Sequence, residues 1–106
     1  MPHVIVSDRA QAGIAHCQAF LRPLAPNAAR RARKVIFDAI KRLGEFPRHG
    51  RPYCPMEPDT AEEGENLREL IIPFGKGGYL ALYHYAEEEN AVYVIAFKHG
   101  KEARYY

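Results

Sequence analysis

Three short segments rich in β-branched and aromatic residues follow one another closely in the second half of the chain. They are residues 67–74, 79–86 and 91–98, and only the Gly-rich link 75–78 and the link 87–90 separate them. Such short links allow only antiparallel hairpins, because a parallel crossover needs a dozen or more residues. The sequence therefore predicts an antiparallel meander, and this constrains the fold more than any other feature.

The N-terminal part predicts one further strand and a helix. Residues 3–7 are short and β-branched, and Ser7 or Asp8 can cap a following helix by accepting a hydrogen bond from a free backbone N–H. The helix should end near Pro23 and Pro26, because proline removes a hydrogen bond. Its apolar stripe recurs every three to four positions, at Ile14, Cys17, Phe20 or Leu21, and Leu24.

A second helix between Pro26 and Gly44 has the clearest pattern. Its apolar residues repeat at helical spacing: Ala28, Ala32, Val35, Ile36, Ala39, Ile40 and Leu43. The short connection at 22–27 folds the two helices into an antiparallel hairpin. Residues 46–66 are rich in Pro and Gly and are expected to be irregular. The predicted fold class is α+β, in the order β-α-α-β-β-β, with the N-terminal helical hairpin packed on a twisted antiparallel sheet.

Successive side chains of a strand point to opposite faces of the sheet, and in the last two predicted strands both sets are largely apolar. One face of the sheet can therefore receive the helices, while the other is aromatic and partly open. In the first of these strands Tyr79, Ala81, Tyr83 and Tyr85 alternate with Leu80, Leu82 and His84. In the second, Val92, Val94 and Ala96 alternate with Tyr93, Ile95 and Phe97.

The length of 106 residues, 47% of them hydrophobic, predicts a single domain that spans residues 1–106. No apolar run approaches the roughly 18 residues that cross a bilayer, and the N-terminus does not resemble a signal peptide. We therefore expect a cytoplasmic protein without a membrane partner.

The cysteines and histidines do not predict a disulfide framework or a metal site. Cys17 and Cys54 are far apart in sequence, and both are expected to be reduced. The five histidines have neither HxxxH nor CxxC-type spacing. No metal and no cofactor is expected.

The net charge of +2 conceals a strong asymmetry. Residues 1–56 carry ten basic and three acidic side chains, residues 57–66 carry five acids and no base, and residues 67–106 carry five of each. A basic first half favours an acidic partner, although a solvated helix face would have the same composition.

Several short motifs occur in one order along nearly the whole chain. They are Pro47-x-x-Gly50-Arg51-Pro52, Leu67-Arg68-Glu69-Leu70, Gly78-Tyr79-x-x-x-Tyr83, the apolar residues 92–96, and His99-Gly100-Lys101-Glu102. On a β-α-α-β-β-β pattern of this length, the combination resembles the ParE/RelE superfamily of toxins from type II toxin–antitoxin systems.

The resemblance implies a toxin that is neutralised by a small antitoxin with a DNA-binding head and an amphipathic tail. The tail would wrap across the helical hairpin and the sheet, folding as it binds. The residues expected to contact it are Arg30, Arg31, Lys34 and Tyr83.

Two kinds of target occur in the superfamily. RelE-like members cut messenger RNA in the ribosome, whereas ParE-like members poison DNA gyrase. The RelE-like pattern has an arginine directly after the Gly-Tyr of the middle strand, and this chain has Leu80 there. Losing one preorganised charge costs on the order of 10²–10³ in rate. The resemblance therefore favours the ParE-like branch and gyrase, a role that requires no catalysis.

The expected target-binding residues lie on the last strands and the tail: Arg68, Lys98, His99, Lys101 and Arg104. If the protein is instead a ribosome-dependent endoribonuclease, its catalytic candidates are Arg68, His99, Arg104 and Tyr105, because the reaction needs a general acid or base and cations around one phosphate. A non-catalytic peptide-binding module or an inactive toxin relic remains a further alternative.

Overall fold

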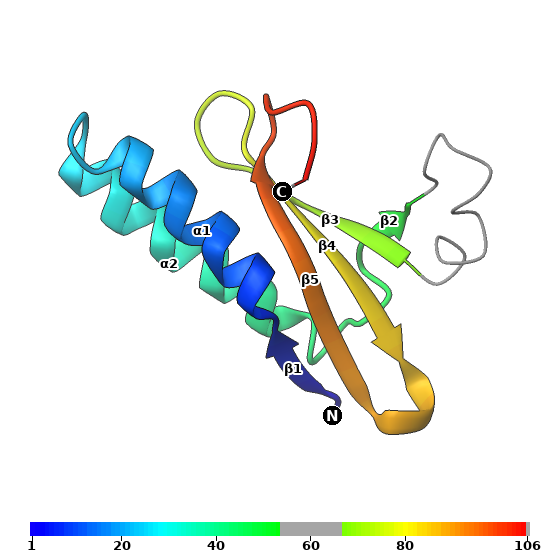
Figure 1. The fold of residues 1–106 in the computed structure, drawn as a ribbon. Coiled ribbons are helices and arrows are strands. Elements are labelled where there is room, and N and C mark those ends of the chain that lie inside the picture. Colours follow the sequence, from blue (N-terminus) through cyan, green and yellow to red (C-terminus); the bar gives the residue numbers. More distant parts are fainter. Residues whose placement is uncertain (54–66, 106) are drawn as a thin grey trace.

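The computed structural model describes residues 1–53 and 67–105 (Figure 1). Cys54, Tyr106 and the acidic stretch 57–66 therefore lie outside the described residues. The elements follow in the order β1 (His3–Val6), α1 (Asp8–Leu21), α2 (Pro26–Arg42), β2 (Arg51–Pro52), β3 (Leu67–Ile72), β4 (Tyr79–Ala86), the 3₁₀ turn η2 (Glu87–Glu89) and β5 (Ala91–His99). The predicted α+β order is confirmed, with the two-residue strand β2 added where an irregular segment was expected.

The helix ends follow the signals in the sequence. Ser7 caps α1, since its Oγ accepts a hydrogen bond from the Ala10 N–H at 3.1 Å, and Pro26 occupies the first turn of α2. Leu21 is half-buried, whereas Phe20 and Leu24 are exposed. The apolar stripe therefore ends at Leu21, and the expectation that Leu24 continues it is wrong because the helix stops before that residue.

The sheet has the strand order β1-β5-β4-β3-β2. The pairs β2–β3, β3–β4 and β4–β5 are antiparallel, which confirms the meander. β1 pairs with β5 in parallel, from His3 opposite Ala91 to Val6 opposite Val94, so the expectation of a purely antiparallel sheet is corrected at this edge. The antiparallel helices α1 and α2 carry the chain out and back over one side of the sheet, and the meander then begins at the opposite edge (Figure 1).

A β-bulge changes which residues of β5 face the helices. Leu82 pairs with Ala96 but the next residue, Tyr83, pairs with Val94, so the register shifts by one residue. An inserted residue reverses the alternation beyond it. Phe97 therefore joins the core that contains Val94, and Ala96 shares the other face with Leu82. The predicted grouping of Ala96 with Val94, and of Phe97 on the opposite face, was wrong for this reason.

The hydrophobic core lies between the sheet and one side of the helical hairpin (Figure 1). Its largest fully buried side chains are Tyr83, Phe97, Ile36, Leu43, Ile72, Val92 and Val94. α1 packs closely on β5, since a Cβ on Gly13 would lie only 2.5 Å from the carbonyl oxygen of Phe97. Among the described residues, no helix combines the length and apolar character that crossing a membrane requires.

Candidate functional site

The structure distributes the predicted site residues over three separate places. Arg68 lies near β2, where its guanidinium donates to the carbonyl oxygen of Gly50 at 2.7 Å and to that of Arg48 at 3.3 Å. It pairs in register with Tyr83, on the face of the sheet that the core occupies. Arg68 thereby holds the loop that leads into β2.

Tyr83 belongs to the same internal arrangement. Its side chain is fully buried, its hydroxyl donates to the carbonyl of Pro47 at 2.8 Å, and it accepts from the N–H of Gly50 at 2.8 Å. Burial raises the pKa of Tyr83 above its ordinary value. A side chain without exposed surface offers no contact to a docking partner, so the expectation that Tyr83 binds the antitoxin is corrected to a structural role.

The second place is the sheet face opposite the helices, which we call the open face. Glu69 lies there, in register with Arg51 on one side and Leu82 on the other. Its side chain is only 7% exposed. Arg51 Nε donates to Glu69 Oε1 at 3.0 Å, and the Tyr105 hydroxyl donates to Glu69 Oε2 at 2.6 Å. The C-terminal tail is thus fastened onto the open face by a buried carboxylate.

Two further contacts support Tyr105 in this position. The ring of Tyr53 meets it edge-on, with centroids 6.2 Å apart, and the Lys98 ammonium lies 5.1 Å from its centroid. Burial first, and then the hydrogen bond to Glu69, raise the pKa of Tyr105 well above its ordinary value. At neutral pH Tyr105 is therefore a protonated hydrogen-bond donor.

Leu80 occupies the open face beside this cluster, between Ile71 and Lys98 in the register. The position at which RelE-like toxins are expected to present an arginine is therefore filled by an apolar side chain. Lys98 lies next to it, and its ammonium donates to the carbonyl of Glu102 at 2.8 Å.

His99 belongs to the third place, at the helix-facing end of β5. Its Nδ1 accepts a hydrogen bond from the Lys101 N–H at 3.1 Å, and its ring meets that of Tyr79 edge-on at 5.5 Å. The Cys17 thiol lies nearby and donates to Glu102 Oε1 at 3.9 Å. Burial first, and then the charge of Glu102, raise the pKa of Cys17 to about 11. These side chains line a cavity of about 530 Å³ between α1, the β3–β4 loop and the tail.

The remaining predicted residues lie on the surface. Lys101 and Arg104 are exposed on the tail, and Arg30, Arg31 and Lys34 are exposed on α2. Lys34 forms a helical ion pair with Asp38 at 2.9 Å, of the kind that contributes little to stability when exposed.

Glu69 and Arg51 organise the open face, but neither was among the site residues predicted from the sequence. One signal was available, since Glu69 is the one carboxylate of β3 and directly precedes the apolar residues Leu70, Ile71 and Ile72. Buried carboxylates are almost always paired, so its partners could have been sought, but their identity depends on the register of β2 and on the path of the tail. Among residues 1–53 and 67–105, no group of three or more acidic, histidine or cysteine side chains is arranged to hold a metal ion.

Comparisons with known proteins agree with this architecture. The sequence profile described as "ParE toxin of type II toxin-antitoxin system, parDE" matches residues 4–104. The toxin RelE3 of Caulobacter vibrioides (strain ATCC 19089 / CIP 103742 / CB 15) is 28% identical over 104 residues, which are 98% of this chain and 100% of that protein. The crystal structure of the intact E. coli RelBE toxin–antitoxin complex contains a chain with a TM-score of 0.53 and 18% identity, covering 98% of this chain and 100% of that one.

The two helices on a mostly antiparallel five-stranded sheet place the domain in the RelE/ParE-like fold class. The profile match over nearly the full length then shows the family. The chain belongs to the ParE toxin family, and it is the toxin component of a type II toxin–antitoxin system.

Proposed function

We propose that this toxin inhibits growth in the cytoplasm by binding a protein target, DNA gyrase, and that a cognate antitoxin neutralises it. The observation that carries the proposal is the separation of the residues that a nuclease would need. Arg68 and His99 pair in register with Tyr83 and Tyr79, positions that lie about 13 Å apart along β4 at roughly 3.3 Å per residue. Tyr105 lies on the opposite face of the sheet.

Cleavage of RNA by the attack of a 2′-hydroxyl needs a base, an acid and cations around one phosphate. In this arrangement the predicted groups cannot surround a single phosphate. Arg68 and His99 are each hydrogen-bonded to the backbone, and Leu80 lies at the centre of the open face. A binding mechanism makes no such demand, because it needs only exposed groups such as Lys101 and Arg104.

The exposed cations of α2 support the proposed antitoxin contact. Arg30, Arg31 and Lys34 project from the face of the helix that the core does not use, and a disordered acidic tail can gain affinity there as it folds. The similar E. coli chain was solved in a complex of a toxin with its antitoxin. The exposed cations make the helical hairpin the first surface to test.

The Glu69 cluster favours a second candidate function. A carboxylate, the Arg51 guanidinium and the Tyr105 hydroxyl are in hydrogen-bond contact, and Lys98 is adjacent to the Tyr105 ring. These are group types that an endoribonuclease can use as base, phosphate ligands and acid. If this were their role, the Tyr105 side chain would have to leave Glu69 before RNA could bind.

Expression in bacteria separates the two functions. The toxin is induced alone and with its neighbouring gene, while growth, plasmid supercoiling and transcript integrity are followed in the same cultures. We expect arrest that the neighbour relieves, loss of supercoiling and intact transcripts. Transcripts cut at codon positions would refute the gyrase proposal, and an absence of arrest would favour a peptide-binding module or an inactive relic.

Two sets of variants sharpen this experiment. Glu69→Gln keeps the volume of the side chain and an oxygen that can accept from Tyr105, but it removes the base. It would therefore abolish transcript cleavage by an open-face nuclease, whereas it can affect gyrase poisoning only through the position of the tail. Arg30→Glu combined with Lys34→Glu on α2 should weaken rescue by the antitoxin at least tenfold, whereas Lys76→Glu, an exposed charge reversal on the β3–β4 loop, should leave rescue unchanged.

A further inference from the structure

The cavity beside α1 has the dimensions and lining of a small-molecule site. Its volume of about 530 Å³ falls within the range of roughly 300–1,000 Å³ that is typical of ligand pockets. Apolar and aromatic side chains from α1, the β3–β4 loop and β4 form most of its wall: Phe20, Leu21, Phe74 and Tyr79. Tyr79 is held in place by stacking on Phe97, with centroids 5.4 Å apart. The neutral part of a ligand would find a preformed surface here.

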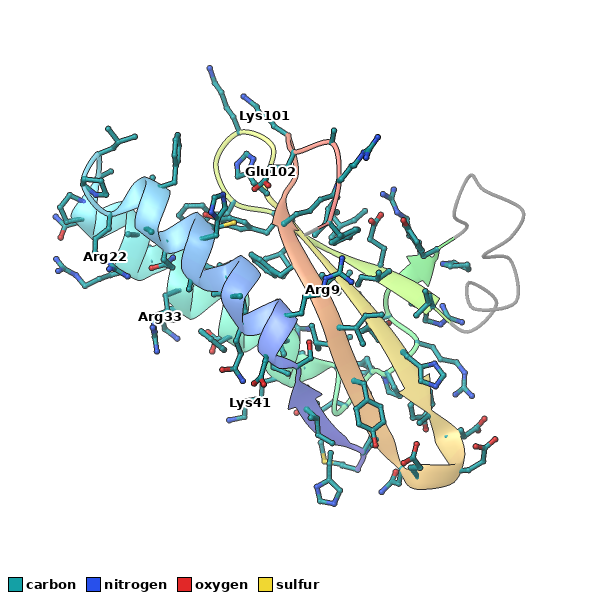
Figure 2. The ribbon with its side chains drawn as sticks, in the orientation of Figure 1. Arg9, Arg22, Arg33, Lys41, Lys101 and Glu102 are labelled. Carbon is teal, nitrogen blue, oxygen red and sulfur yellow. The ribbon has the colours of Figure 1, made fainter. Side chains whose placement is uncertain are left out.

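Two lysines from different segments border the same cavity. Lys76 comes from the β3–β4 loop and Lys101 from the tail, and both side chains are exposed. Figure 2 shows Lys101 extending from the tail, with Glu102 beside it at the cavity. The rim of the cavity is therefore cationic on the side opposite α1.

The loops that carry these lysines are held against each other by direct backbone contact. Gly100 N–H donates to the carbonyl of Gly78 at 2.9 Å, and a Cβ on Gly100 would lie 1.8 Å from the carbonyl oxygen of Gly77. Gly77 has φ +89°, a conformation that L side chains rarely adopt. Only glycines permit this approach, so the proximity of Lys76 and Lys101 is built into the backbone.

The floor of the cavity determines where a charged group can lie. Glu102 is there, and its Oε1 accepts from the Cys17 thiol and, at 3.2 Å, from the His99 N–H. A second anion deep in the cavity would be repelled by this carboxylate. An anionic group is therefore favoured at the rim, beside the two lysines, while the apolar part of the same molecule points inward.

We propose that this cavity binds a small amphiphilic carboxylate, with its apolar body against Phe20, Phe74 and Tyr79 and its carboxylate at Lys76 and Lys101. The proposal is independent of the gyrase target. Because the cavity joins α1 to the tail, a bound ligand stabilises the tail in the position seen here, and its effect is measurable as a rise in the thermal unfolding temperature.

The test compares ligands that share one chain but differ in charge. Decanoate, decanol and decylammonium are titrated into the purified toxin by calorimetry at pH 7.5, below their micellar concentrations. We expect decanoate to bind roughly tenfold or more tightly than decylammonium, with decanol between them, since two exposed ion pairs change sign between the two charged ligands. Equal affinities for decanoate and decylammonium would overturn the proposal.

Three variants test the assigned groups. Lys76→Glu combined with Lys101→Glu should weaken decanoate about tenfold and strengthen decylammonium. Phe20→Ser should weaken both ligands about threefold or more, because it removes apolar contact, and Phe20 is 72% exposed, so folding is little affected. The matched control is Arg33→Glu with Lys41→Glu, an equal change in charge on the helical hairpin away from the cavity (Figure 2), and it should change neither affinity by more than about twofold.

Competition with the antitoxin separates this proposal from a protein-binding surface. Decanoate should still bind the purified toxin–antitoxin complex with unchanged affinity. If decanoate does not bind the complex, the cavity belongs to the antitoxin interface and the proposal is refuted. If Lys76→Glu combined with Lys101→Glu leaves the affinity for decanoate unchanged, the predicted carboxylate site is refuted.

Discussion

Replacing Tyr83 with phenylalanine tests whether one buried hydroxyl holds the segment between α2 and β2. The hydroxyl donates to Pro47 and accepts from Gly50, both at 2.8 Å, and the tyrosine is fully buried. Tyr83→Phe leaves the Pro47 carbonyl and the Gly50 N–H without this partner. An unpaired buried group costs about 1–3 kcal/mol. The Gly50 N–H is buried and the Pro47 carbonyl is part-buried, so the expected loss in unfolding free energy is roughly 2–4 kcal/mol.

The assay is urea and thermal denaturation of the purified toxin, followed by circular dichroism. For a domain of this size the loss corresponds to a melting temperature lower by roughly 10–20 °C. Tyr93→Phe is the matched control, since its hydroxyl bonds Glu89 at an exposed position at 3.0 Å, and it should change stability by less than about 0.5 kcal/mol. If Tyr83→Phe lowered the unfolding free energy no more than Tyr93→Phe does, the Tyr83 hydroxyl would not be the group that holds this segment.

Three further predictions follow from buried groups. The pKa of Tyr105 is raised in the folded state. The stability that this residue supplies is therefore fully present below its unfolded pKa of about 10 and is lost as the pH rises above it. Tyr105→Phe should reduce this alkaline loss of stability in unfolding curves measured between pH 8 and 11. The pKa of Cys17 is raised from 9.0 to about 11, which lowers its thiolate fraction roughly 100-fold. In a Cys54→Ser background, a disulfide reagent should therefore label Cys17 slowly in the folded protein and rapidly in urea. Equal labelling rates in the folded protein and in urea would contradict the burial of Cys17. Gly13→Ala places a methyl group 2.5 Å from the Phe97 carbonyl oxygen and should cost about 1–3 kcal/mol in unfolding free energy, whereas Ala12→Gly on the exposed side of α1 should cost no more than about 1 kcal/mol.

Local patterns were sufficient for most of the fold. Ser7 and Pro26 begin the helices where the capping rules predict, and the short links at 75–78 and 87–90 produce antiparallel hairpins. These features depend on a few neighbouring residues, and they could therefore be predicted from the sequence. The sequence did not predict that Phe97 faces the core and Ala96 the opposite side, because the bulge arises from pairing with β4 rather than from any pattern within β5.

The site was less predictable than the fold. Arg68, His99 and Tyr105 were grouped because they are basic or titratable and lie on the last strands or the tail. Arg68 and His99 instead lie at different points along the helix-facing side of the sheet, and the path of the tail carries Tyr105 to the open face. Glu69 was overlooked although it fastens the tail. Its importance depends on Arg51 and Tyr105, which are distant in sequence and meet only once the strands have paired.

The sequence by itself determined the two helices, the four longer strands, their order and the family, because helical periodicity, capping residues and short turns act over a few residues and the motifs keep their order along the chain. Only the tertiary structure decided the parallel pairing of β1 with β5, the burial of Tyr83, the fastening of Tyr105 to Glu69 and the cavity between α1 and the tail. Each of these is a contact between segments far apart in the chain, and it depends on strand register and packing, which no local pattern specifies.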